Sequence, residues 1–246
     1  MKKLSKLLMA LGICLSAVIS LNTYATGNYK PRSPVEKVSK SLTVVEKKVR
    51  NAAVKVMAGG GHGSGTVVQY KDLTLVLTAR HVADGPLGAE YLVSNKDEQR
   101  TAVLIYQSKN HDVAVLVLKK EFYNLKAMSW KPTKSYDIGT DIVYSGHPSW
   151  HKLMSFTGRI VGYEEVAGAG TQLIVNTYGW FGCSGSGVYN TDGELIGILY
   201  GVDVQYVYGT QIQENMIWVA PIKNIDIDTS IEAFCRGSVK SYRACK

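Results

Sequence analysis

The sequence predicts an all-β fold, either a sandwich or a pair of barrels. Most of its apolar segments are short, rich in β-branched residues and separated by Gly, Asn or Asp, which is typical of strands joined by tight turns. Twelve such segments occur, and this number fits two barrels of about six strands each. The 246 residues, of which 46% are hydrophobic, are enough to bury one large core or two small ones.

Six expected strands precede residue 125 and six follow residue 138. We therefore expect one barrel over about 51–125, a second over about 138–225, and a C-terminal tail over 226–246. In chain order, the expected strands are Ala53–Met57, Gly65–Tyr70, Thr74–Leu77, Tyr91–Val93, Ala102–Tyr106, Val113–Leu118, Asp141–Tyr144, Ser155–Gly162, Leu173–Asn176, Gly187–Tyr189, Leu195–Tyr200 and Met216–Val219.

The N-terminus has the pattern of an export signal. Three lysines within the first six residues precede an uncharged apolar run over Leu7–Leu21, which is shorter than a typical membrane span of about 20 residues. Thr23-Tyr24-Ala25 then offers a small-residue cleavage site. We expect residues 1–25 to be a signal peptide of an exported, periplasmic or secreted protein; an uncleaved membrane anchor is the alternative.

A basic arm follows the expected signal peptide. The formal net charge of the chain is +8, and residues 26–55 carry eight Lys or Arg against two Glu. Apolar residues recur there at three- and four-residue intervals and predict an amphipathic helix within 26–50. We favour a helix that docks on the first barrel with its basic face solvated; attachment to an anionic surface or to nucleic acid is the alternative. The recurring residues are Val35, Val38, Leu42, Val45 and Val49.

The segment Gly182–Gly187 contains a candidate nucleophile. It reads Gly-Cys-Ser-Gly-Ser-Gly, and a serine between glycines can act as a nucleophile whose own backbone N–H helps to bind an oxyanion. Because no side chain blocks the backbone at Gly182, a second N–H can point into the same oxyanion hole. Gly182 and Ser184 are therefore the expected oxyanion-hole donors.

A histidine and an aspartate lie upstream in the order that acyl transfer needs. His81 follows the apolar segment that begins at Leu75, and Asp112 opens a strongly apolar segment that ends at Leu118. A serine hydroxyl needs a general base, and the base needs an acceptor that fixes its tautomer and stabilises its imidazolium form. His81, Asp112 and Ser184 are therefore a candidate catalytic triad.

This order of motifs, with Thr-Ala-x-His and Asp-x-Ala-x-Leu contexts, resembles the chymotrypsin/trypsin-like serine peptidases (PA clan). The style of the motifs is most similar to the bacterial HtrA/Do-like branch, although too few residues follow Ile222 for the PDZ domain of HtrA proteins, so we expect no PDZ-dependent role. The further segments that carry the resemblance are Gly63–Val68, Ser145–Pro148, Phe156–Val161 and Asn190–Ile198.

The resemblance implies two packed six-stranded antiparallel barrels with the active site in the cleft between them. It also implies an exported serine endopeptidase that hydrolyses peptide bonds through an acyl-enzyme on Ser184. A catalytically weak or inactive relative that binds peptides or proteins is the alternative, and an esterase is a third possibility. The expected substrate pocket consists of Thr177, Tyr178, Tyr200 and Gly201, which favours small or medium uncharged residues at P1.

Four cysteines occur, and Cys14 lies in the expected signal peptide. Cys235 and Cys245 bracket a polar segment and are expected to close a small disulfide loop in an oxidising compartment, three free thiols being the alternative. Cys183 is a possible nucleophile, as in viral cysteine peptidases of the same fold. Because Ser184 directly precedes the Gly-x-Gly turn, we expect Cys183 to be a neighbour that lines the oxyanion loop or the pocket entrance.

We expect no metal and no cofactor. The histidines other than His81 are scattered without partners at ligand spacing. The glycine-rich stretch 59–65 lacks the lysine of a phosphate-binding loop and leads into a strand, so it is expected to be a turn. The expected partners are a protein or peptide substrate and, through residues 26–55, an anionic surface; the physiological substrate and the oligomeric state stay open.

Overall fold

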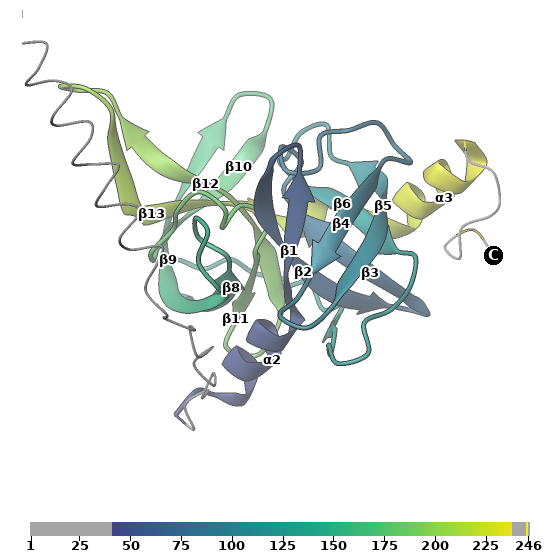
Figure 1. The fold of residues 1–246 in the computed structure, drawn as a ribbon. Coiled ribbons are helices and arrows are strands. Elements are labelled where there is room, and N and C mark those ends of the chain that lie inside the picture. Colours follow the sequence, from purple (N-terminus) through teal and green to yellow (C-terminus); the bar gives the residue numbers. More distant parts are fainter. Residues whose placement is uncertain (1–40, 238–244, 246) are drawn as a thin grey trace, which may run out of the picture. The chain divides into compact units, whose positions relative to one another are not determined.

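The computed structural model describes residues 41–237 and 245. The expected signal peptide, Cys14 and residues 26–40 of the basic arm lie outside the described residues. Figure 1 shows the described chain as two barrels side by side, with one helix below them and another beyond the outer side of the first barrel.

The first barrel is closed by six antiparallel strands. The strands are β1 (Ala53–Ala58), β2 (Gly61–Tyr70), β3 (Leu73–Thr78), β4 (Glu90–Ser94), β5 (Gln99–Gln107) and β6 (Ala114–Leu118). They pair in the order β1-β4-β5-β6-β3-β2, and pairing of β2 with β1 closes the ring. The glycine-rich stretch 59–65 was expected to be a turn, but only Gly59 and Gly60, both with positive φ, make the turn between β1 and β2. Residues 61–65 belong to β2.

The second barrel is also closed and antiparallel. Its strands are β8 (Asp141–Gly146), β9 (Met154–Val166), β10 (Gly170–Asn176), β11 (Gly187–Asn190), β12 (Leu195–Gln205) and β13 (Gln211–Pro221). They pair in the order β10-β13-β12-β11-β8-β9. All twelve expected strands are therefore present, and the prediction of two six-stranded antiparallel barrels is confirmed. The short strand β7 (Met128–Ser129), which pairs in parallel with β2, was not expected.

Each barrel has its own apolar interior, and a third cluster joins the two. This third cluster combines side chains from the N-terminal helix, both barrels and the C-terminal helix, including Val49, Leu75, Tyr189, Ile198 and Phe234. All five are at most 3% exposed. Because the barrels share this apolar contact, their relative position is held by burial as well as by loops.

Helix α2 (Val44–Ala52) begins at Thr43, whose side chain and that of Glu46 form a reciprocal capping box. Its buried residues are Val49 and Ala52. The helix packs against β8 of the second barrel as well as β2 of the first, so the expected docking on the first barrel alone is corrected to docking on both. The reason is that its apolar stripe enters the cluster that the two barrels share.

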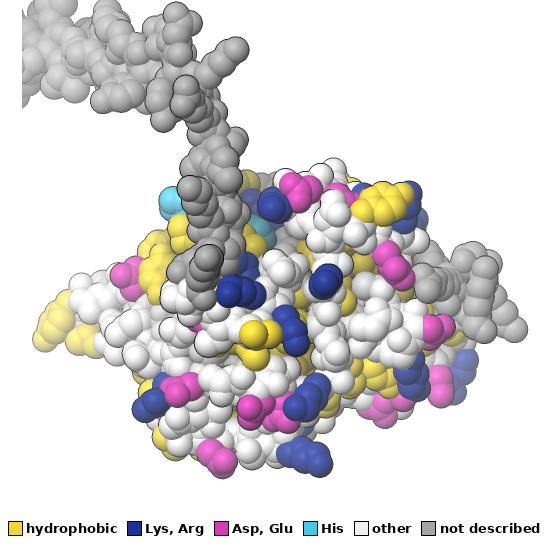
Figure 2. Space-filling view, turned by 90° about the horizontal axis from the view of Figure 1, so that it is seen from below, with side chains coloured by type: hydrophobic (Ala, Val, Ile, Leu, Met, Phe, Trp, Pro, Cys, Tyr) yellow, Lys and Arg dark blue, Asp and Glu magenta, His cyan; other side chains and the backbone are white. Residues whose placement is uncertain are grey.

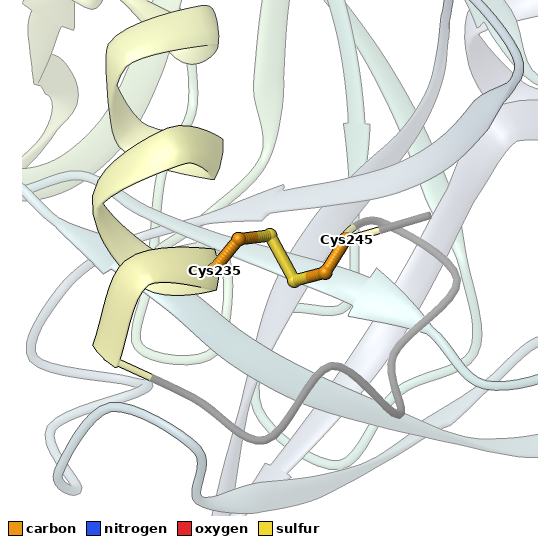
Figure 3. The surroundings of a disulfide bond; sticks show 2 residues. All are labelled: Cys235 and Cys245. Carbon is orange, nitrogen blue, oxygen red and sulfur yellow. A yellow bond between two sulfur atoms is a disulfide. The ribbon is translucent and has the colours of Figure 1, made fainter.

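The short 3-10 helix Ile222–Asn224 ends the region expected for the second barrel, and the region expected to be a tail contains helix α3 (Ile227–Gly237). Helix α3 packs against β5 of the first barrel and buries Phe234, although the chain enters it from the second barrel. A disulfide joins Cys235 on α3 to Cys245 and is shown in Figure 3. This is the pairing that the sequence predicted. Cys183 is free and buried.

The described surface is mixed in charge. On the face shown in Figure 2, Lys and Arg side chains alternate with Asp and Glu side chains. Within the part of the chain that the structure describes, no helix is both long and apolar enough to cross a bilayer.

Candidate active site

His81 lies directly after β3 in a single helical turn. The N–H groups of Val82 and Ala83 both donate to the carbonyl of Ala79, at 3.1 and 3.2 Å. Ala79, Val82 and Ala83 are buried in the first barrel, which fixes the turn. The His81 side chain is 49% exposed and is therefore accessible to a substrate.

Asp112 lies in the loop between β5 and β6 and binds His81 through both carboxylate oxygens. Oδ2 is 2.6 Å from His81 Nδ1, and Oδ1 accepts from the His81 backbone N–H at 2.9 Å. Burial favours a higher pKa for Asp112, but the hydrogen bonds and charge of His81, together with Arg80, outweigh burial and lower this pKa. Asp112 is thus held as a carboxylate that fixes the imidazole with Nδ1 protonated.

The nucleophile loop, defined here as Phe181–Ser184, belongs to the second barrel but touches the first. The Ser184 carbonyl accepts from the Ser64 N–H of β2 at 2.7 Å. Between the nucleophile loop and the His81 turn lies Gly63, where a Cβ would stand 2.8 Å from Ser184 O and 2.4 Å from Val82 Cγ2. Only a glycine at this position lets the two segments approach so closely.

The Ser184 hydroxyl donates to the backbone carbonyl of Tyr200, at 3.3 Å, instead of to His81. Burial, followed by the charge of Asp112, raises the pKa of Tyr200 to about 12. Tyr200 thus contacts Ser184 through its backbone carbonyl.

Two backbone N–H groups of the nucleophile loop are free to bind an oxyanion. Across the described residues, neither the Gly182 N–H nor the Ser184 N–H donates to an acceptor. Gly182 has φ of +95°, a conformation that favours glycine, and a Cβ there would stand 2.4 Å from His147 O. These are the two groups that the sequence predicted as oxyanion-hole donors.

A family model described as a trypsin-like peptidase domain matches residues 63–198, which include His81, Asp112 and Ser184. The chain belongs to the trypsin-like peptidases. No curated protein matches this trypsin-like peptidase.

Solved structures have the same fold as this trypsin-like peptidase at low sequence identity. The serine endoprotease from Yersinia pestis is 21% identical with a TM-score of 0.62, covering 81% of this chain and 68% of its own. An inactive mutant form of Rv3671c from M. tuberculosis is 16% identical with a TM-score of 0.59, covering 84% and 98%. A second inactive form of the Rv3671c protease is 17% identical with a TM-score of 0.57, covering 77% and 92%.

The expected substrate-pocket residues of this trypsin-like peptidase differ in their burial and in their contacts. Thr177 is buried and its hydroxyl donates to Thr157 O at 2.8 Å, so its polar group is used inside the barrel. The Tyr178 ring lies 5.4 Å from the Phe156 ring and is 38% exposed. Tyr200 is half-buried between the barrels, and Gly201 follows it on β12.

Sequence reasoning missed Ile217 on β13. It is fully buried, and a Cβ on Gly179 would stand 2.3 Å from Ile217 Cγ2 and 3.2 Å from Val202 Cγ1. These two side chains therefore fill the space next to Gly179, which directly follows Tyr178 of the expected pocket. No local signal marks Ile217, because its role comes from strand pairing of β13 with β10 and β12.

Cys183 does not line the oxyanion loop or the pocket entrance, which corrects the expectation from the sequence. Its side chain is fully buried in the second barrel, with Sγ 3.9 Å from Tyr144 Oη. Burial raises the pKa of the Cys183 thiol, so the thiolate that a cysteine nucleophile needs is disfavoured. Among residues 41–237 and 245, no three His, Cys, Asp or Glu side chains gather as a metal site would require.

Proposed function

We propose that this trypsin-like peptidase is an exported serine endopeptidase that acts through an acyl-enzyme on Ser184. The observation that carries the proposal is the His81–Asp112 pair, with Nδ1 to Oδ2 at 2.6 Å, next to a serine loop with two free N–H groups. The pair supplies an oriented general base, and the N–H groups supply the preorganised dipoles that acyl transfer needs.

In the proposed first step, the Ser184 hydroxyl turns from Tyr200 O toward His81 Nε2 and attacks the peptide carbonyl carbon. The proton moves from Ser184 Oγ to Nε2, while Asp112 stabilises the imidazolium through Nδ1–H. The carbonyl oxygen becomes an oxyanion held by the N–H groups of Gly182 and Ser184. Collapse breaks the C–N bond, His81 returns the proton to the leaving amine, and an acyl-enzyme remains.

In the proposed second step, water replaces the amine. His81 takes a proton from the water as its oxygen attacks the acyl carbon, and the same two N–H groups hold the second oxyanion. Collapse breaks the bond to Ser184 Oγ, and His81 returns the proton to that oxygen. The products are a carboxylic acid and the regenerated Ser184 hydroxyl.

The test of this function combines labelling with hydrolysis. A fluorophosphonate probe should label the wild-type protein at Ser184, and the protein should cleave casein or a peptide library. Ser184→Ala and His81→Ala should each lose about 10⁴- to 10⁶-fold in turnover. If Ser184→Ala keeps near-wild-type cleavage, the assignment is wrong. A wild-type protein that binds peptides tightly without labelling or cleaving them supports the alternative peptide-binding role.

We also propose a preference for small or medium uncharged residues at P1. Ile217 and Val202 occupy the space beside Gly179, and Tyr178 stands in the pocket segment without a carboxylate. An apolar contact of one methylene discriminates by only about 1 to 3 kcal/mol, so the preference should be broad. A peptide library scanned at P1 tests it, and strong selection for Lys or Arg contradicts the pocket assignment.

Export and surface attachment are proposals that rest on the N-terminal sequence. The basic n-region, apolar run and Thr23-Tyr24-Ala25 site support cleavage before Thr26. The cationic residues of 26–55 support salt-sensitive binding to anionic surfaces. N-terminal sequencing of the mature protein tests the first. Sedimentation with anionic and neutral vesicles, at low and high salt, tests the second, and equal binding to both vesicle types rejects it.

A further inference from the structure

We propose that the buried side chain of Ser64 is a positioning residue that sets the oxyanion hole. The proposal rests on the function proposed above and extends it to a residue of the first barrel. The Ser64 hydroxyl donates to Gly182 O at 2.7 Å and accepts from the His147 N–H at 2.9 Å. It thereby joins β2, the β8–β9 loop and the nucleophile loop at one buried point.

The carbonyls of the nucleophile loop accept hydrogen bonds, whereas the N–H groups of Gly182 and Ser184 stay free to bind an oxyanion. The Phe181 carbonyl accepts from Ser149 N at 2.6 Å, and the Ser184 carbonyl accepts from Ser64 N at 2.7 Å. In a trans peptide, the C=O and the N–H of the same plane point in opposite directions. Fixing the Phe181 carbonyl therefore points the Gly182 N–H away from Ser149, toward the side where a substrate oxyanion binds.

Ser64 fixes the next peptide plane in the same way. The Gly182 carbonyl accepts from the Ser64 hydroxyl, and the Cys183 N–H of that plane donates to Trp180 O at 2.9 Å. The Cys183 carbonyl in turn accepts from Ser186 N at 3.0 Å, which leaves the Ser184 N–H pointing outward. Without the Ser64 hydroxyl, the Gly182 carbonyl loses its donor, and the peptide between the two oxyanion-hole N–H groups loses one of its two anchors.

The direction of the Ser64 hydrogen bonds is determined by their partners. The His147 N–H can only donate, so it uses an oxygen lone pair of the hydroxyl. The single hydroxyl proton is then available to Gly182 O, which can only accept. Gly146 leaves room for this hydroxyl, because a Cβ at that position would stand only 3.1 Å from Ser64 Oγ. The side chain is completely buried, so water cannot replace the lost donor at low cost.

The test compares Ser64→Ala with wild type in peptide hydrolysis and in binding of two matched inhibitors. The Ser184 hydroxyl adds to the carbonyl carbon of a peptidyl aldehyde, and the resulting hemiacetal places an oxyanion in the oxyanion hole. The corresponding peptidyl alcohol cannot form this bond and fills only the substrate subsites. We expect kcat/KM and aldehyde affinity to fall together by about tenfold to a hundredfold, mainly through kcat, with alcohol affinity and KM within about twofold.

Ser145→Ala is the matched control. Ser145 is also a buried serine of the same region, and its hydroxyl pairs with Ser155 Oγ at 3.0 Å without touching the nucleophile loop. The substitution removes an equivalent buried hydroxyl, and it should leave kcat/KM and the affinities for the aldehyde and the alcohol near wild type. An equal fall in kcat/KM for Ser145→Ala and Ser64→Ala overturns the proposal, because general loosening of the barrel then explains the loss.

Two further outcomes overturn the proposal. One is a Ser64→Ala enzyme with wild-type kcat/KM and aldehyde affinity; the other is equal loss of aldehyde and alcohol affinity. If Ser64→Ala does not fold, Ser64→Cys replaces it, because a thiol has nearly the shape of the hydroxyl but is a weaker donor. Its kcat should fall by less than the tenfold to hundredfold expected for Ser64→Ala. A wild-type protein that neither hydrolyses peptides nor reacts with the fluorophosphonate contradicts the proposed function itself, which separates the two failures.

Discussion

At the scale of single residues, Asp112 has two separate contacts with His81. One carboxylate oxygen accepts from the ring at Nδ1 and the other from the backbone N–H, so Asp112 fixes both the tautomer and the turn that carries the ring. In Asp112→Asn, the amide can no longer hold an imidazolium by charge. We expect kcat to fall by about 10³- to 10⁴-fold with a small change in KM.

Steady-state kinetics with a peptide substrate measures this prediction, and a thermal melt of the same variant provides the control for folding. Hydrolysis by Asp112→Asn within tenfold of wild type would show that His81 is oriented by other groups. A wild-type melting temperature together with the expected loss of kcat assigns the effect to chemistry instead of to the fold.

The lowered pKa of His147 predicts that the folded protein loses stability in acid. Burial, followed by the charges of Lys55, His62 and Arg50, lowers the pKa of His147 from its ordinary 6.5 to about 4. Between these values the unfolded chain binds a proton that the folded chain does not, so stability rises with pH over this window and is lost on acidification. The loss from pH 6.5 to pH 4 should be about 3 kcal/mol.

Urea unfolding of wild type and His147→Gln, at several pH values between 4 and 7, measures this contribution. His111, whose pKa is also lowered by burial, is present in both proteins, so the difference in slope isolates His147. The variant should show a shallower dependence of unfolding free energy on pH. Parallel curves for the two proteins would contradict the prediction.

The candidate triad and the candidate oxyanion-hole donors could be named from the sequence because each has a local signal. His81 and Asp112 stand at the ends of apolar strands, and Ser184 stands between glycines. The role of Ser64 has no such signal, because its hydroxyl meets Gly182 from a strand 118 residues away. The placement of Cys183 was mispredicted because nothing local in the sequence shows that its side chain lies near Tyr144 in the core of the second barrel.

At the scale of elements, the disulfide ties the end of α3 to Cys245. In the chain-entropy model, closing a loop of about 11 residues stabilises by roughly 2 to 3 kcal/mol. Paired replacement of both cysteines by serine should therefore lower the unfolding free energy by about this amount. It should leave hydrolysis unchanged, because α3 packs on β5, away from the nucleophile loop.

Alkylation under denaturing, non-reducing conditions followed by intact-mass analysis checks the bond directly. One alkylated cysteine, Cys183, is expected in a mature protein that lacks Cys14. Three alkylated cysteines in that protein would show that the bond does not form. Reduction before alkylation supplies the positive control.

The sequence predicted the strands better than it predicted the helix ends and the smallest strand. Alternating β-branched segments carry their own signal, so every expected strand is present. Strand β7 has two residues and exists only because it lies alongside Val68 and Gln69 of β2. Helix α3 was expected to be a tail because its charges obscured an apolar stripe of Ile227, Ile231 and Phe234.

At the scale of the whole molecule, the shared apolar cluster predicts one cooperative unfolding transition. It contains residues of α2, both barrels and α3, so neither barrel keeps its interior when the other unfolds. Deletion of residues 26–40 should leave this single transition in place and keep the rate of peptide hydrolysis within severalfold of wild type. Deletion of residues 26–52 removes the buried Val49 and Ala52 and should lower the unfolding free energy by several kcal/mol.

Circular dichroism and calorimetry of the two deletion proteins, with hydrolysis measured in parallel, distinguish these cases. Equal stability of both deletions would show that α2 contributes little to the shared cluster. Loss of folding on deletion of residues 26–40 would show that the basic arm is itself part of the fold.

The hydrogen bond from Ser64 N to Ser184 O crosses from one barrel to the other at the proposed nucleophile. The backbone that carries the reactive hydroxyl is therefore also part of the seam between the two halves of the molecule. A small sliding of one barrel along the other would displace Ser184 before any strand is lost. The rate of reaction with a fluorophosphonate would then report the alignment of the two barrels. Under mild denaturation this rate should decline at a lower denaturant concentration than the circular dichroism signal.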